Sequence, residues 1–407
     1  MDKKLIQIFS SSMWLNEIRI SKKFGAIRMQ FPDKIRDLSK KIVELSPWNI
    51  RAIVLCGSFA KGEESIVTEN NETHLLSDYD LEVLVKVLDP KIMRRIDALA
   101  KKTSLDVSIG IIPLFYLRKL KMIQIYELKK NGIVIFGNKS HLDEISLEIP
   151  SDIPKWEGIR LLLNAIMDMN ALVKYENLIG IINKFQFRSM LYACAKAYLA
   201  CCRALLTFMG EYRTSLSESY ALFSEIYVSK FQSLSKILPD LPNKVKFGLE
   251  FKLNPTISRI AKSPSFWFEA RNYILTVLQY ALSLYLRKPE ADLFMLLNIL
   301  EDLPVQPLLN ILYSLSLLMK IGKMPPLSIF LNSPMILAQI SGVYVISAVD
   351  ESGFIKKSFI KKAFQKIRKV YPVKEFCESW DLIKQVIGDV WKIAPTYALE
   401  KDIIPNW

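Results

Sequence analysis

Residues 51–86 constrain the fold of this chain more than any other stretch. An apolar run at 52–56 has the length of a buried strand and passes directly into Gly57 and Ser58. A strand that ends in Gly-Ser predicts a tight turn where the backbone comes close to another group. A polar segment follows, and the apolar run after it predicts a second strand that begins near Asp78.

Asp78 and Asp80 fall on one face of this second strand, because side chains alternate between the two faces of a sheet. Two neighbouring carboxylates repel each other unless a cation lies between them. Mg²⁺ prefers such hard oxygen ligands and is usually held by one or two carboxylates plus substrate phosphates. An acidic strand start can also be plain solvated surface, and the preceding Gly-Ser turn favours the metal site over that alternative.

The order strand, Gly-Ser turn, spacer, Ser-Asp-x-Asp and strand resembles the signature of the DNA polymerase β-type nucleotidyltransferase superfamily. The resemblance implies that Gly57 and Ser58 hold a nucleoside triphosphate (NTP). It also implies that Asp78 and Asp80 bind Mg²⁺ or Mn²⁺. The reaction expected from the family is phosphoryl transfer assisted by two metal ions.

A third carboxylate reaches the family's site from a later apolar strand, and Asp106, flanked by apolar residues, matches that position. Asp106 is therefore expected to bind metal and to take a proton. Lys61 stands where many relatives have Arg before Gly, and it is a further candidate for a phosphate contact. Glu82 shares the strand face of the aspartates as an alternative base, although a structural or surface role is favoured for it. The resemblance covers residues 45–140.

The spacer between Ser58 and Asp78 is longer than the family usually shows. Its polar residues at 63–76 predict an inserted loop. Two roles stay open for this loop, since it either contacts the acceptor or is tolerated surface.

The closing part of this region also resembles small antibiotic-modifying nucleotidyltransferases, in which Glu-Leu-Lys, here at 127–129, precedes Gly and a short apolar strand. Helical patterns then replace strand patterns, and they resemble the bundle that follows minimal or kanamycin nucleotidyltransferase-like domains. The expected fold is an α/β nucleotidyltransferase domain, with a small mixed sheet and helices, plus a mostly α-helical C-terminal region. The expected domains are 1–148 for the nucleotidyltransferase domain, 149–290 for the helical bundle and 291–407 for a further helical region.

The charge balance favours an anionic partner. The 407 residues include 55 Lys and Arg against 41 Asp and Glu, a net charge of +14. The stretch 353–370 predicts a basic amphipathic helix that contacts an anionic surface, either a phosphate backbone or a membrane. The alternative is a solvated lysine face over an ordinary packed helix.

Neither a secretory signal nor an uninterrupted apolar run of about 20 residues is visible. The apolar stretches 273–286 and 335–349 carry polar residues and predict buried helices. The five cysteines have no Cys-x-x-Cys spacing and no disulfide framework. A reducing, cytoplasmic location is therefore expected.

The function expected from these observations is the transfer of a nucleoside monophosphate, most simply AMP, from an NTP to a hydroxyl group of a small molecule or a protein. Two alternatives remain. One is template-independent nucleotide addition to an RNA or DNA end, which the basic charge favours, although no RNA-binding motif is present. The other is a non-catalytic, antitoxin-like partner protein that binds nucleotide, against which the intact set of carboxylates argues.

Overall fold

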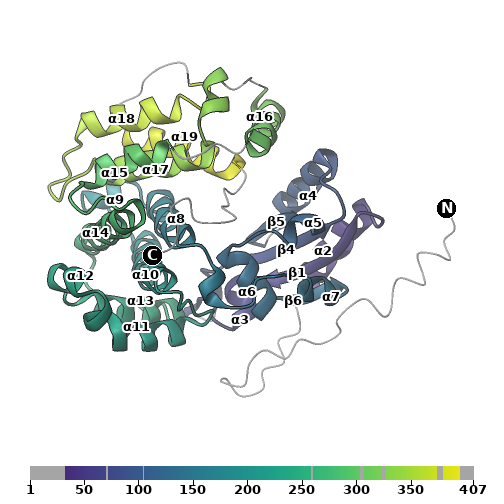
Figure 1. Ribbon diagram of the computed structural model, residues 1–407, viewed down its shortest axis with the longest axis horizontal. Helices are drawn as coiled ribbons and strands as arrows, with labels where there is room; N and C mark the ends of the chain where they lie inside the picture. Colours follow the sequence, from purple (N-terminus) through teal and green to yellow (C-terminus); the bar gives the residue numbers. More distant parts are fainter. Residues whose placement is uncertain are drawn as a thin grey trace. The chain divides into compact units, whose positions relative to one another are not determined.

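A computed structural model describes residues 33–69, 72–103, 105–257, 260–302, 307–322, 324, 326–373 and 379–394 (Figure 1). The chain separates into two compact units, Met1–Ile153 and Pro154–Trp407. The three-domain division proposed from the sequence stays a prediction.

The first unit is a small mixed sheet with helices. Its four-stranded sheet has the order β5-β4-β1-β6, in which β1 runs antiparallel to β4 and β6 while β4 and β5 run parallel. Its elements in chain order are α2 (Asp33–Leu45), β1 (Ile50–Cys56), α3 (Gly57–Lys61), β2 (Ile66–Glu69), β3 (Glu72–Leu75), β4 (Tyr79–Val85), α4 (Pro90–Lys102), β5 (Val107–Pro113), α5 (Leu114–Leu117), α6 (Ile123–Asn131), β6 (Ile133–Gly137) and α7 (Ser140–Asp143).

One face of this sheet is buried against α2 and α4. The two helices are amphipathic, and Ile35 of α2 and Ile96 of α4 join a core with Ile53 of β1 and Leu81 of β4. The other face carries the alternate residues of the same strands. There Cys56 pairs with Asp80 across the antiparallel register. The packed face thus fixes the strands, while the opposite face is where the candidate site residues lie.

The spacer before β4 is not the simple loop that its polar composition predicted. It forms a two-stranded hairpin, β2 with β3, in which Ile66 pairs with Leu75. The ends of the hairpin meet, since the amide of Leu76 donates to the carbonyl of Ser65 at 2.9 Å. The prediction failed because cross-strand pairing, which a composition does not reveal, supplies the backbone hydrogen bonds of this segment.

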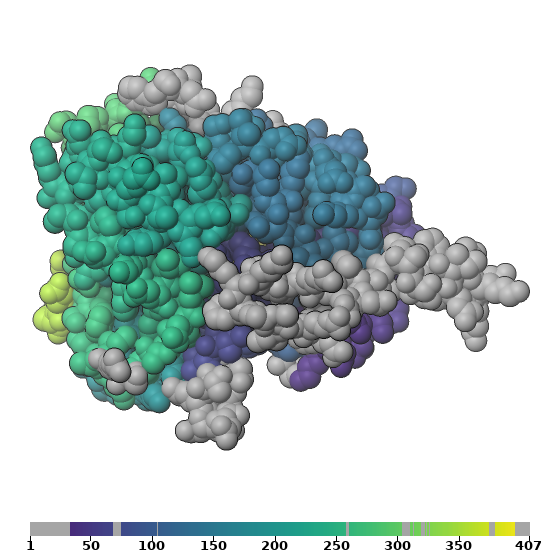
Figure 2. All heavy atoms as spheres, turned by 90° about the horizontal axis from the view of Figure 1, so that it is seen from below, coloured from purple at the N-terminus to yellow at the C-terminus, as the bar shows by residue number. Residues whose placement is uncertain are grey.

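The second unit is helical in its described residues, as the sequence predicted. The short 3₁₀ helix η1 (Pro150–Asp152) still belongs to the first unit. The elements of the second unit are α8 (Trp156–Leu172), α9 (Tyr175–Leu178), α10 (Lys184–Phe208), α11 (Leu216–Lys230), α12 (Gln232–Ile237), α13 (Leu241–Leu253), α14 (Ser265–Leu286), α15 (Leu293–Glu301), α16 (Pro307–Ile321), η2 (Leu327–Leu331), α17 (Pro334–Ile346), α18 (Lys357–Ile367) and α19 (Trp380–Ile393). In Figure 2 the teal and green spheres belong to this unit.

Two of these helices are strongly apolar. α10, the longest, begins with a capping box between Asn183 and Gln186, and by length and composition it is able to cross a membrane. However, 78% of its most apolar window is buried inside the protein, as in the core helix of a soluble protein. α17 is buried along its whole length, and its Gln339 donates to Asn164 of α8 at 2.8 Å. The predicted burial of 335–349 is therefore confirmed over α17.

The basic helix predicted at 353–370 is shorter than expected. α18 spans Lys357–Ile367, and its buried Ile360 and Phe364 pack within the helical unit. Phe354, which the sequence placed on the apolar face, lies before the helix and is 64% exposed. The reason is that Ile355 forms a β-bridge with Val349, so the chain is extended there and the helical spacing does not reach back to it.

Candidate functional site

The turn after β1 lies directly against one carboxylate of β4. Gly57 has φ +65°, a left-handed conformation in which glycine is favoured. A Cβ atom built on Gly57 would lie 1.9 Å from Oδ2 of Asp80, well inside any allowed contact. Because Gly57 has no side chain, the turn can pack directly against the Asp80 carboxylate. The sequence prediction of a close backbone approach at Gly-Ser is confirmed.

Several contacts hold this turn on the sheet. Ser58 lies in the single-turn helix α3, and its carbonyl accepts from the amide of Glu63 at 2.9 Å. Phe59 is buried and stacks on Tyr79 of β4, with 4.1 Å between ring centroids. Tyr79 is therefore a core residue, as the sequence predicted. The stacking of Phe59 on Tyr79 therefore holds α3 against β4, the strand that carries Asp80.

The three aspartates sit at the matching ends of two parallel strands. Asp78 precedes β4 and Asp106 precedes β5, and the amide of Tyr79 donates to the carbonyl of Asp106 at 2.9 Å. Asp80 pairs in register with Ser108 of β5. The backbone thus brings the three positions to one edge of the sheet, with Asp106 exposed at that edge.

The donor set at this edge suits Mg²⁺ or Mn²⁺, because carboxylate oxygens are the ligands that such hard cations prefer. Within the described residues, no group of three or more His, Cys, Asp or Glu side chains is close enough to hold a metal ion. One or two carboxylates with substrate phosphates are sufficient for Mg²⁺. Asp78 and Asp80 therefore fit as ligands in chemistry, and their metal-binding role stays a prediction, whereas the described residues build no three-carboxylate site.

Glu82, the next residue along this strand face, is buried rather than at the surface. Its Oε1 accepts a hydrogen bond from Gln124 of α6, and among the described residues its Oε2 has no hydrogen-bond partner. Gly110 of β5 makes room for the carboxylate, since a Cβ atom there would lie 2.1 Å from Glu82 Oε2. Burial raises the pKa of Glu82 to about 7, the hydrogen bond from Gln124 lowers it, and the nearby Asp80 raises it further.

Gln124 and Gly110 were not singled out by the sequence. The signal available for them was weak, because a Gln within an amphipathic helix and a Gly within a strand are both common. Their importance depends on the pairing of β4 with β5 and on the placement of α6, which only the fold supplies.

Lys61 is already paired. Its Nζ lies 3.1 Å from Oε1 of Glu127 on α6 and 3.7 Å from Oε2 of Glu63. Its side chain is only 10% exposed. A phosphate contact by Lys61 therefore requires an exchange of partners, and the role predicted from the sequence stays a prediction.

Cys56 is the last residue of β1 and lies beside Asp80. Its Sγ donates to the carbonyl of Asp80 at 3.4 Å. Burial raises the pKa of its thiol, and the negative charges of Glu82 and Asp80 raise it further. The thiol therefore stays protonated and packs as a small apolar group.

Comparison with known proteins adds little to this geometry. No protein-family model and no curated protein matches the chain. Among solved structures, it is similar to the spectinomycin adenyltransferase AAD(9) from Enterococcus faecialis, solved with ATP and spectinomycin. The sequence identity is 16% and the TM-score 0.35, and the match covers 60% of this chain and 98% of that chain. A similarity of this size decides neither fold nor function.

Proposed function

We propose that the chain is a metal-dependent nucleotidyltransferase that moves a nucleoside monophosphate, most simply AMP from ATP, to a hydroxyl group of a small molecule or a protein. One observation carries this proposal. The Gly57 turn, a candidate phosphate-binding turn, lies in contact range of Asp80, a candidate metal ligand. A nucleotide held at this turn has its phosphates beside the carboxylates that would share its cation.

Each residue has a distinct task in this proposal. Ser58 and the backbone amides after Gly57 hold the β- and γ-phosphates. Asp78 and Asp80 would hold Mg²⁺, which supplies charge neutralisation at the phosphates when it is bound. Lys61 leaves Glu127 and turns to a phosphate oxygen when the nucleotide binds.

The transfer itself is a substitution at the α-phosphorus. The acceptor oxygen forms a bond to the α-phosphorus, the bond from that phosphorus to the bridging oxygen breaks, and pyrophosphate leaves. Asp106, exposed at the same sheet edge, takes the proton of the acceptor hydroxyl. The acceptor has to approach from that open edge, since Glu82 and Cys56 are buried deeper on the same face.

Label transfer tests this function. The purified chain is incubated with Mg²⁺ or Mn²⁺, each α-labelled NTP in turn, and a fractionated cytoplasmic extract. This extract is used because we propose that the chain is located in the cytoplasm. The expected result is label in a small-molecule or protein fraction. Asp80→Asn should abolish it, because a neutral amide binds Mg²⁺ much more weakly than a carboxylate does. Asp37→Asn, the same change at an exposed position of α2, is the matched control and should keep full activity.

Other outcomes contradict the proposal in distinguishable ways. Label confined to RNA or DNA ends would identify nucleotide addition to nucleic acid instead. Tight nucleotide binding without any transfer, together with a stable protein complex that Asp80→Asn leaves unchanged, would identify a non-catalytic partner protein. Full activity in Asp80→Asn would contradict the proposal that Asp80 is a metal ligand.

A further inference from the structure

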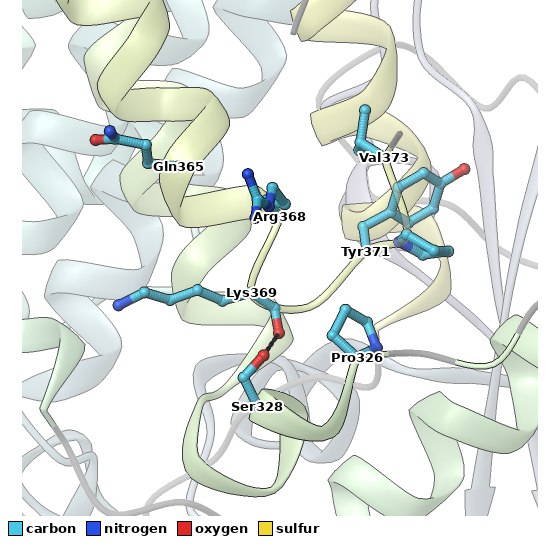
Figure 3. Close-up of a pocket in the computed structure, with 8 residues that line it drawn as sticks. Pro326, Ser328, Gln365, Arg368, Lys369, Tyr371 and Val373 are labelled. Atoms are coloured by element: carbon cyan, nitrogen blue, oxygen red, sulfur yellow. Dashed lines mark hydrogen bonds between the residues drawn. The ribbon is translucent and has the colours of Figure 1, made fainter. Parts of the chain in front are cut away.

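A recess of about 490 Å³ lies on the helical unit, between η2 and the end of α18. One wall comes from Pro326 and Ser328 at the start of η2, and the other comes from side chains between residues 365 and 373 (Figure 3). The hydroxyl of Ser328 donates to the carbonyl of Lys369 at 2.6 Å, the contact dashed in the figure, so the two walls are bonded directly. The volume falls in the range of small-molecule binding sites, about 300–1,000 Å³.

Both walls are also fixed to α16. The hydroxyl of Tyr313 donates to the carbonyl of Val370 at 3.0 Å, and the side-chain amide of Asn310 donates to the carbonyl of Asn332, at the end of η2, at 3.0 Å. Tyr313 and Asn310 are buried, so these bonds are shielded from water. The fold therefore sets the shape of the recess, as in binding sites that are formed before the ligand arrives.

The charges around the recess favour an anion. Among the described residues that line it, none is acidic, whereas Arg368 and Lys369 are cations. Lys369 shares Glu301 of α15 with Lys366, so its charge is already matched by a carboxylate. The Arg368 guanidinium has no hydrogen bond or ion pair within the part of the chain that the structure describes. Its charge is therefore available to a ligand.

Tyr371 offers the recess its ring rather than its hydroxyl. Figure 3 shows the hydroxyl on the side of the ring that faces away from Arg368. Burial raises the pKa of Tyr371, and the negative charge of Asp389 on α19 raises it further. An anionic group is therefore disfavoured beside the hydroxyl and favoured beside Arg368. Further apolar surface, and one amide, come from Pro326, Pro372, Val373 and Gln365.

We propose that the recess binds a small molecule that carries one phosphate or carboxylate group on a flat apolar body. The planar guanidinium of Arg368 can form two parallel hydrogen bonds to such an anionic group, which the ammonium group of a Lys cannot do. The ring of Tyr371 packs against the flat body. One available cation matches one anionic group, and the volume suits a body of roughly one or two rings.

A nucleic acid or an anionic membrane fits the recess less well. Both present many phosphates, and affinity for them grows with the number of cations that face them. Here Lys366 and Lys369 are engaged by Glu301, which leaves Arg368 as the available cation of the described lining. A single guanidinium beside an aromatic ring suits a single anionic group instead.

Ligand-observed NMR with the full chain, in the absence of divalent metal ions, tests the proposal. Phenyl phosphate and benzoate are the probes, because they carry the two anionic groups on the same ring, and the tighter of the two identifies the preferred group. It should bind with a dissociation constant on the order of 1 mM, as expected for so small a ligand. Methyl phosphate, which lacks the ring, and phenol, which lacks the anion, should bind about fivefold more weakly or less.

Variants of the recess separate its parts. Arg368→Gln should weaken binding of the tighter probe about tenfold, because a charge-assisted contact is lost. Tyr371→Leu should weaken it about fivefold through the loss of ring stacking, whereas Tyr371→Phe should leave it unchanged. Lys361→Gln is the matched control, since it removes an exposed cation from α18 outside the recess and should leave binding unchanged. Circular dichroism should report an unchanged thermal transition for Arg368→Gln, whose side chain is exposed.

Several outcomes would overturn the proposal. Neither probe might bind, or Arg368→Gln might bind as well as the wild type, and either result would show that the guanidinium holds no such anion. Equal affinity for phenyl phosphate and methyl phosphate would mean that no apolar body is recognised. Loss of binding in Ser58→Ala but not in Arg368→Gln would place the probe at the Gly57 turn of the first unit. Tighter binding of an RNA oligonucleotide, weakened by Arg368→Gln, would identify a nucleic-acid contact instead.

The test is independent of the proposed function. The recess belongs to the second unit, whereas the Gly57 turn and the aspartates belong to the first. Nucleotidyl transfer is not measured, so its absence would leave the binding results unaffected. Binding of the probe to Asp80→Asn should equal that of the wild type.

Discussion

Glu82 is a buried carboxylic acid whose ionisation the fold resists. With a pKa of about 7 in the fold, Glu82 keeps its proton at a pH where the unfolded chain, with an ordinary pKa of 4.5, has lost it. Its contribution to stability is therefore fully present below pH 4.5 and is lost as the pH rises to about 7. The loss should reach about 3 kcal/mol in the free energy of unfolding.

Urea unfolding of the wild-type chain and of Glu82→Gln across this pH range measures that contribution. The variant cannot ionise, so its stability should fall less than that of the wild type between pH 4.5 and pH 7. The difference between the two curves isolates Glu82 from the other titrating groups. Parallel curves would show that Glu82 does not carry this pH dependence.

Gly57 gives a second prediction at the scale of one residue. In Gly57→Ala the new methyl group meets the Asp80 carboxylate and the φ of +65° becomes strained, at a cost of about 1–2 kcal/mol. Asp80 has to rotate away, and the proposed transfer should slow about hundredfold because a ligand is misplaced by an ångström or more. The rate of label transfer from ATP measures this effect.

Gly180→Ala separates strain from misplacement. Gly180 also has a positive φ, of +95°, but no atom of the described residues lies within 4 Å of its Cβ position. This variant should lose similar stability and keep its transfer rate. Equal rates in the two variants would contradict the role given to the Gly57 turn.

The residues of the site differ in how far the sequence could predict them. The approach of Gly57 to another group followed from local rules, since a glycine directly after a strand signals a turn. Gln124 did not follow, because its bond to Glu82 joins residues 42 positions apart. Lys61 carried the right charge for phosphate, but its pairing with Glu127 depends on α6, so its partner was beyond any local rule.

The hairpin of β2 and β3 carries the prediction at the scale of an element. The bond between Ser65 and Leu76 brings the ends of the hairpin together, and the amide of Ser65 also donates to the hydroxyl oxygen of the buried Ser77 at 2.9 Å. Replacing residues 66–75 by Gly-Gly should therefore leave the sheet intact. The cost should be about 2 kcal/mol, because Val67 is buried.

Calorimetry with ATP and initial rates at varied acceptor concentration measure the result. ATP affinity should be unchanged, since the proposed phosphate contacts lie outside the deleted segment. A higher KM for the acceptor alone would assign the hairpin to acceptor recognition, and an unchanged KM would leave it as tolerated surface. Loss of ATP binding would contradict the separation of the hairpin from the nucleotide site.

Elements with strong periodicity were predicted well and irregular ones were not. α2 begins and ends almost where the spacing of its apolar residues indicated, because one amphipathic face decides both its helicity and its packing. The helix at 353–370 was predicted too long, since the β-bridge between Val349 and Ile355 overrides the helical spacing. Hairpin formation in the spacer was missed for the same reason, as strand pairing is not a local property.

At the scale of the whole molecule, the two units should fold independently. The core of the first unit is built within residues 33–153, where Ile42, Leu55 and Val83 are buried together. The second unit buries large side chains of its own, such as Trp267 and Trp380. A unit that has its own apolar core can fold alone. Fragments 1–153 and 154–407 should therefore each unfold in a cooperative transition, measured by circular dichroism during heating.

ATP binding then assigns the proposed nucleotide site to one fragment. Gly57, Ser58, Asp78, Asp80 and Asp106 all belong to the first unit, so fragment 1–153 should bind ATP with Mg²⁺ as tightly as the full chain does, and fragment 154–407 should not bind. Asp80→Asn within fragment 1–153 is the control and should weaken binding. A folded fragment 1–153 that binds no ATP would mean that the Gly-Ser turn and the aspartates do not form a nucleotide site by themselves, whatever the full chain catalyses.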